Sequence, residues 1–295
     1  MKRYWRWLAW ALVLGFLGRK LVQSWSDVQQ LSWQPGWEQW WLMAGLVTTS
    51  AHLWAGWLWG QSLGFLGYPV PSRWAVPLYV QTNLAKYIPG NVWHFYGRVR
   101  AAQARQIPTG IVLVSILLEA LLLAAAALLV GIHRWQQGSW PLLALVVVLV
   151  GIHPWCLNRL LTWVGRRKVQ GTALPPLRQY PLPLLLGNLL FLGLRGLGFL
   201  CVLGTWVSLS WRLLPVLWGA FGLAWLLGFI VPLAPGGLGV FEATLTVSLQ
   251  GVIPTGTVLA AAIGYRLVSV LAEIAAAAVG VGIEWGRRDL NPHDL

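Results

Sequence analysis

Two long apolar runs constrain this chain more than any other feature of its sequence. Residues 109–132 and 258–285 are apolar on all helix faces, and both exceed the ~20 residues that a helix needs to cross a bilayer core. Of the 295 residues, 57% are apolar and only 10% are charged. Soluble domains carry about 25% charged residues. The sequence therefore predicts an all-α polytopic membrane protein.

Seven apolar spans are expected, and two further segments interrupt the pattern between them. The interrupted segments cover residues 75–99 and 233–252. We expect one transmembrane domain over residues 1–295, with about 7–8 transmembrane helices and two discontinuous, reentrant segments. The expected spans lie at residues 7–25, 40–62, 109–132, 139–157, 182–207, 213–231 and 257–284.

Basic residues indicate how the chain is oriented in the membrane. The net charge of +13 is concentrated between apolar spans, which argues against nucleic-acid binding. The longest polar connection, 158–180, carries Arg159, Arg166, Arg167, Lys168 and Arg178 and is expected in the cytoplasm, together with an N-terminal helix that is retained uncleaved. The C-terminus is left open. It lies outside if 233–252 enters and leaves on one side, and inside if that segment crosses, which the basic residues favour.

Both interrupted segments contain helix breakers. Proline lacks an amide donor and glycine loosens the backbone, so Pro89-Gly90 and Pro235-Gly236-Gly237 should unwind or end a helix. The backbone groups exposed in this way must be buried in protein or line a wet cavity. A helix restarting after such a break presents its positive end to an anion such as phosphate. The alternative is a hairpin with a purely architectural role.

Charged residues also lie within the apolar spans, where each needs a partner or water. These residues are Glu119, Arg195, Arg266 and Glu273. For Arg266 we expect Glu119 or Glu242 as partner. For Glu273 we expect Arg195, Lys86 or Arg98. Structural ion pairs that hold the helices together are the alternative to a binding site.

Two matching distances raise the question of an internal repeat. Pro89 precedes Glu119 by 30 residues, and Pro235 precedes Arg266 by 31. A duplication with halves of about 40–157 and 182–284 would produce this match, and so would chance. Paired broken segments in two halves are typical of transport sites.

No pattern for catalysis or for a cofactor accompanies these features. The sequence has no phosphate-binding Walker loop, no serine-hydrolase motif and no aspartate pair for a metal, so we expect neither an enzyme nor a bound cofactor or metal. Gly56, Gly60 and Gly64 form a small-residue ridge that predicts close helix packing, either within the chain or in a dimer.

The stretches "NLAKYIPGNVWHFYGRV", "VPLAPGGLGVFEATL" and "GYRLVSVLAE" resemble the transmembrane region of lysylphosphatidylglycerol synthases and the related stand-alone flippase-like proteins. The sequence departs from that pattern at Asn91 and Phe241, where relatives often carry basic residues. The resemblance implies a lipid-handling domain of the bacterial inner membrane without the soluble aminoacyl-transfer domain. The positions that match are Lys86, Tyr87, Pro89, Gly90, Arg98, Pro235, Gly236, Gly237, Gly239, Glu242, Arg266 and Glu273.

From these observations we expect a lipid flippase or transporter that binds a lipid head group in an intramembrane cavity. Lys86, Arg98 and Arg266 would hold its phosphate, and Glu119, Glu242 and Glu273 would balance charge. Two alternatives stay open. One is an intramembrane transferase acting on a lipid-linked substrate, with Glu242 or Glu119 as base. The other is an accessory subunit that binds a partner enzyme through the glycine ridge. A homo-oligomer is a further possible assembly.

Overall fold

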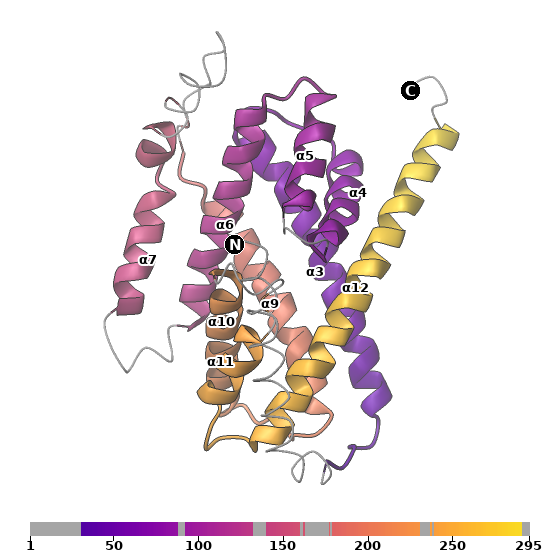
Figure 1. Ribbon diagram of the computed structural model, residues 1–295, viewed down its shortest axis with the longest axis vertical. Helices are drawn as coiled ribbons and strands as arrows, with labels where there is room; N and C mark the ends of the chain where they lie inside the picture. Colours follow the sequence, from indigo (N-terminus) through magenta and orange to yellow (C-terminus); the bar gives the residue numbers. More distant parts are fainter. Residues whose placement is uncertain are drawn as a thin grey trace, which may run out of the picture. The chain divides into compact units, whose positions relative to one another are not determined.

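The computed structural model describes residues 31–87, 92–131, 140–159, 162, 177, 179–230, 237 and 239–290. Within these ranges the chain is helical and has no strands (Figure 1). Three helices are long and apolar enough to cross a membrane: α6 (Thr109–Gly131), α9 (Leu182–Gly204) and α12, which runs from Thr255 to Leu290. The predicted class, an all-α membrane protein, is therefore confirmed, whereas the number of spans and the reentrant segments stay predictions. The expected span 7–25 lies outside the described residues.

Most predicted spans coincide with observed helices. In addition to α6, α9 and α12, α3 (Trp37–Phe65) corresponds to 40–62 and α10 (Leu214–Ile230) to 213–231. The span predicted at 139–157 is interrupted, because α7 (Trp140–Gly151) ends before a turn at Ile152 and His153. Pro154 explains this end, since proline disfavours helical geometry in the residue before it and supplies no amide donor.

Both interrupted segments consist of short helices. In the first, α4 (Ser72–Asn83) continues into a 3-10 helix, η1 (Leu84–Tyr87), and α5 (Trp93–Gln103) follows. In the second, α11 (Val240–Ser248) follows α10. Gly237 and Gly239 have φ angles of +68° and +81°, which are left-handed and therefore favour glycine just before α11. The helices thus end and restart around the predicted breakers, whereas Pro89, Gly90, Pro235 and Gly236 themselves lie outside the described residues.

The chain divides into two compact units, and the division does not follow the order of the sequence. One unit, called the α10–α11 unit here, comprises residues 1–48, 127–141 and 193–271. The other, the α4–α5 unit, comprises residues 49–126, 142–192 and 272–295. The predicted repeat halves, 40–157 and 182–284, stay a prediction.

An aromatic cluster forms the core of the α10–α11 unit. The rings of Phe199, Phe221, Phe241 and Tyr265 come from four different helices, and their centroids lie 5.6–6.4 Å apart. All four side chains are buried. Helices α10 and α11 pack against each other, as Figure 1 shows. Because Phe241 belongs to α11, the cluster fixes the position of this helix, which also carries Glu242.

The glycine ridge of α3 packs against α4 within the α4–α5 unit. A Cβ atom on Gly60 would lie 2.8 Å from Cβ of Ala75, and one on Gly56 would lie 3.0 Å from Cα of Val76. Both distances are shorter than a normal contact, so the backbones of α3 and α4 approach closely because these residues are glycines. Of the two uses predicted for the ridge, the structure shows packing within the chain.

This packing predicts different effects for the same substitution at two positions of α3. Gly60→Ala should lower the free energy of unfolding by about 1–3 kcal/mol, since the new methyl group overpacks against Ala75. Gly45→Ala is the matched control, because a Cβ atom there meets nothing within 4 Å. Thermal unfolding of both variants in detergent measures the difference. Equal stability of the two variants would contradict the close approach of α3 and α4.

Candidate functional site: buried charges beside the two interruptions

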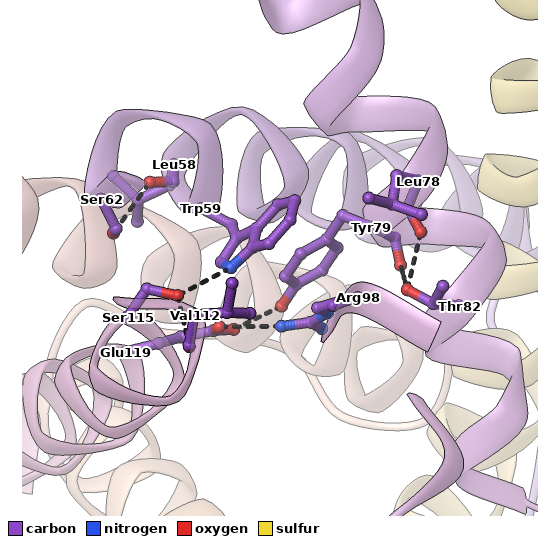
Figure 2. A network of polar contacts seen from close by, with 10 residues as sticks. All are labelled: Leu58, Trp59, Ser62, Leu78, Tyr79, Thr82, Arg98, Val112, Ser115 and Glu119. Carbon is purple, nitrogen blue, oxygen red and sulfur yellow. Dashed lines mark hydrogen bonds and ion pairs between the residues drawn. The ribbon is translucent and has the colours of Figure 1, made fainter. Parts of the chain in front are cut away.

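The first set of charged residues lies in the α4–α5 unit and centres on Glu119. Figure 2 shows the Tyr79 hydroxyl and the Arg98 guanidinium converging on the Glu119 carboxylate. Tyr79 donates to Oε1 at 2.6 Å, and Nη1 of Arg98 donates to Oε2 at 3.0 Å. Both carboxylate oxygens are therefore bonded. This arrangement links α4 and α5, on either side of the first interruption, to the long helix α6.

Aromatic rings enclose the Arg98 guanidinium. Its central carbon lies 3.9 Å from the ring centroid of Tyr79 and 5.5 Å from that of Trp59, distances at which cation–π attraction is effective. Trp59 in turn donates from Nε1 to the Ser115 hydroxyl at 3.3 Å. The Arg98 side chain is only 2% exposed. Arg98 was predicted to contact a ligand, but here it is occupied by an ion pair and two rings.

A small cavity opens beside this set. Its walls include Tyr79, Glu119, Ser62 and Asn188, with Trp59 and Phe191 as aromatic neighbours. It has room for about one water molecule. The Glu119 side chain, 19% exposed, is the part of the ion pair that this space reaches. The cavity suits a water molecule and is too small for a lipid head group.

A second ion pair in the same unit joins Lys86 to Glu273. The Lys86 ammonium at η1 lies 2.6 Å from Oε1 of Glu273 on α12. Nε2 of His52 on α3 lies 3.5 Å from the same oxygen. The side chain of Glu273 is 2% exposed, whereas that of Lys86 is 24% exposed. Lys86 was one of three partners predicted for Glu273, and this pairing is confirmed.

The third ion pair lies in the α10–α11 unit. Nε of Arg266 on α12 donates to Oε1 of Glu242 at 2.8 Å, and Nη2 donates to the carbonyl of Gly237 at 2.8 Å. The other oxygen of Glu242 accepts the backbone N–H of Gly239 at 2.6 Å. Glu242 was a predicted partner of Arg266 and is confirmed. The other candidate, Glu119, is paired with Arg98 instead.

Glu242 therefore fills the positive end of α11. A carboxylate in the first turn that accepts a backbone N–H from the residue before the helix is a common way to satisfy helix amides. We expected the backbone amides at this helix end to face an external phosphate. The Gly239 amide instead donates to Glu242. The group presented to the surroundings is Arg266, whose side chain is 27% exposed.

Aromatic stacking also orients Arg266. Its guanidinium carbon lies 5.0 Å from the centroid of Phe241, the residue at which the sequence departs from the pattern it resembles. Arg195, the remaining charge predicted within a span, is buried, and its guanidinium carbon lies 5.2 Å from the ring of Tyr265. Aromatic rings thus contact both Arg195 and Arg266.

The predicted site residues are thus gathered in two sets, each within its own unit. Lys86, Arg98, Glu119 and Glu273 lie in the α4–α5 unit, and Gly237, Gly239, Glu242 and Arg266 lie in the α10–α11 unit. Tyr87 ends η1, and its side chain lies outside the described residues together with Pro89, Gly90, Pro235 and Gly236.

Sequence reasoning missed several residues that complete these sets. His52 and Trp59 are single positions on α3, and Tyr79 is one of several aromatic residues in the first interrupted segment. His52 had a detectable signal, since a histidine within an apolar span needs a partner. Tyr79 and Trp59 had none, because an aromatic residue in such a helix is as compatible with lipid contact as with a polar role.

Comparison with protein-family models and with curated proteins found no match to this chain. The family resemblance described above accordingly stays a prediction.

The buried pair of Arg98 and Glu119 makes a stability prediction. Glu119→Gln leaves the Arg98 charge buried without its counter-ion, which should lower the free energy of unfolding by about 3–5 kcal/mol. Tyr79→Phe removes one hydrogen bond and should cost about 1 kcal/mol. Unfolding in detergent measures both. The double variant Arg98→Met/Glu119→Leu should recover much of the loss. A double variant that is less stable than Glu119→Gln alone would contradict this account of the pair.

Proposed function

We propose that the protein is a lipid flippase or lipid transporter without enzymatic activity. It binds the phosphate-bearing head group of a phospholipid, or of a polyprenyl-linked or other glycolipid, in an intramembrane cavity. In this proposal it is a multi-pass protein of the bacterial inner membrane with 7–8 spans, two reentrant segments and a cytoplasmic N-terminus. Its partner is a membrane lipid.

The observation that carries the proposal is the way Arg266 is held. This residue lies on α12, one of the helices long and apolar enough to cross a membrane. An ionised side chain at the centre of a membrane-spanning helix costs about 2.5–3.5 kcal/mol on insertion scales. Such a residue marks a functional site unless other side chains fully enclose it. Glu242, Gly237 and Phe241 orient the guanidinium, yet 27% of the side chain stays exposed. A planar guanidinium fixed in this way suits a phosphate oxyanion.

Lys86 supplies a second cation of the same kind in the α4–α5 unit. Its side chain is 24% exposed and its ammonium is held by Glu273. Arg98 differs, because Trp59 and Tyr79 enclose it. We therefore assign phosphate binding to Arg266 and Lys86, and a structural role to Arg98. Glu242 orients Arg266, and Glu119 orients Arg98, because each carboxylate forms an ion pair with that arginine.

The same contacts favour transport over the transferase alternative. Glu119 and Glu242 are the candidate bases of that alternative. Both oxygens of each carboxylate accept a hydrogen bond, and one bond of each comes from an arginine. Each candidate base is therefore already engaged by an arginine and a second donor, and neither carboxylate has an oxygen without a hydrogen bond to offer a substrate.

The proposal predicts that Arg266→Met slows movement of fluorescent phosphatidylglycerol between the leaflets of proteoliposomes by about tenfold or more, since a hydrogen bond to a charged group contributes about 1.5–3 kcal/mol. Arg266→Lys keeps a charge opposite Glu242 and should retain stability while losing rate, because an ammonium lacks the planar donor pair. Arg212→Met is the control, since Arg212 is exposed in the same unit. An Arg266→Met protein as active as the control would contradict the proposal.

A further inference from the structure

Among the described residues, three glutamates pair with the cations of the two sets, and Glu273 differs from Glu119 and Glu242. Glu119 accepts from Tyr79 and Arg98, and Glu242 accepts from Gly239 and Arg266, with each oxygen bonded once. Glu273 uses only Oε1, which faces both Lys86 and His52. Its Oε2 is buried and has no hydrogen-bond partner among the described residues. Glu273 is therefore the least satisfied of the three carboxylates.

A buried carboxylate with one unbonded oxygen depends on its counter-ion more than a fully bonded one does. Leaving a charged oxygen without a donor costs about 1–3 kcal/mol or more, and a buried carboxylate that loses its counter-ion becomes neutral instead. At Glu273 that counter-ion is the Lys86 ammonium, whose Nζ lies 2.6 Å from Oε1. A proton is the one ligand that replaces this ammonium without needing further space.

The two partners of Glu273 suit such an exchange. Lys86 ends in a compact ammonium on a flexible four-carbon stem, which moves without any change in the backbone. His52 is 7% exposed, and its Nε2 lies 3.5 Å from the carboxylate. A neutral imidazole at that position accepts a hydrogen bond from a protonated carboxyl group.

Other charged groups near this cluster belong to the same unit. His94 on α5 is buried and lies within electrostatic range of both Lys86 and Arg98. Arg98 is neutralised by Glu119, which Tyr79 also bonds. The charge of Lys86 is thus balanced by Glu273, and the charge of Arg98 is balanced by Glu119. A second anion that takes Lys86 leaves Glu273 as an unpaired buried charge.

We propose that Glu273 exchanges Lys86 for a proton when a lipid phosphate binds Lys86. The phosphate oxyanion takes over the ammonium, one proton from the medium binds the Glu273 carboxylate, and His52 accepts its hydrogen bond. Charge balances, since a bound anion and a bound proton enter together. This inference rests on the proposed function, in which Lys86 is a head-group ligand. It makes the protein a proton-coupled lipid carrier.

Proton uptake on ligand binding tests the exchange. Purified wild-type protein in weakly buffered detergent is mixed with phosphatidylglycerol, and a pH indicator and a separate binding assay are read in parallel. About one proton should be taken up per lipid bound. Glu273→Gln should bind the lipid without uptake. Lys86→Met already lacks the counter-ion, so it should bind more weakly and also take up no proton. Glu284→Gln, on the same helix, is the control and should behave as wild type.

The outcomes separate the two proposals. Lipid binding without proton uptake in the wild type, or equal uptake by wild type and Glu273→Gln, overturns the exchange and leaves the proposed function standing. Absence of lipid binding overturns both. Uptake with inorganic phosphate as well as with phosphatidylglycerol supports the exchange at Glu273 but identifies the ligand as free phosphate. If Glu273→Gln does not fold, Lys86→Met decides, and full uptake by that variant overturns the exchange.

Discussion

Pairing of charges inside an apolar helix bundle is the constraint on which the rest of this structure depends. Arg98 with Glu119, Lys86 with Glu273 and Arg266 with Glu242 each join a residue next to a helix interruption to a residue on a long helix. An isolated charge there would destabilise the fold by several kcal/mol. The short helices next to the interruptions therefore carry charges whose partners lie on other helices, and each ion pair ties an interrupted segment to a long helix.

Two of these pairs have related positions and opposite polarity. In the α4–α5 unit the helix after the interruption carries the cation, Arg98, and the next long helix carries the anion, Glu119. In the α10–α11 unit the corresponding helix carries the anion, Glu242, and the next long helix carries the cation, Arg266. Along the chain, the first of these pairs lies in the run α3, α4, η1, α5 and α6, and the second lies in the run α9, α10, α11 and α12. The predicted duplication of the chain stays a prediction.

Much of this architecture was predictable because the signals are strong and local. Long apolar runs predicted the helices, and proline and glycine predicted the two interrupted segments. The end of α7 before Pro154 was not predicted, since a single span was expected over 139–157. Partners for Arg266 and Glu273 followed from the rule that a buried charge needs an opposite one, and few candidates were available. The choice among them was not predictable, since it depends on how helices distant in sequence pack. Tyr79, Trp59 and His52 enter the sites for that reason.

The contacts also divide the cations by function. Arg98 is enclosed by rings and an ion pair and serves the fold. Lys86 pairs with Glu273 and Arg266 pairs with Glu242, and both side chains stay about one quarter exposed. Our central claim is that Arg266 and Lys86, each within its own unit, are cations that bind lipid phosphate. Mass spectrometry of lipids that remain bound after gentle purification tests it most directly. We predict a phosphate-bearing lipid in stoichiometric amount on the wild type and its loss from an Arg266→Met/Lys86→Met protein. Equal lipid content in both proteins would contradict the claim.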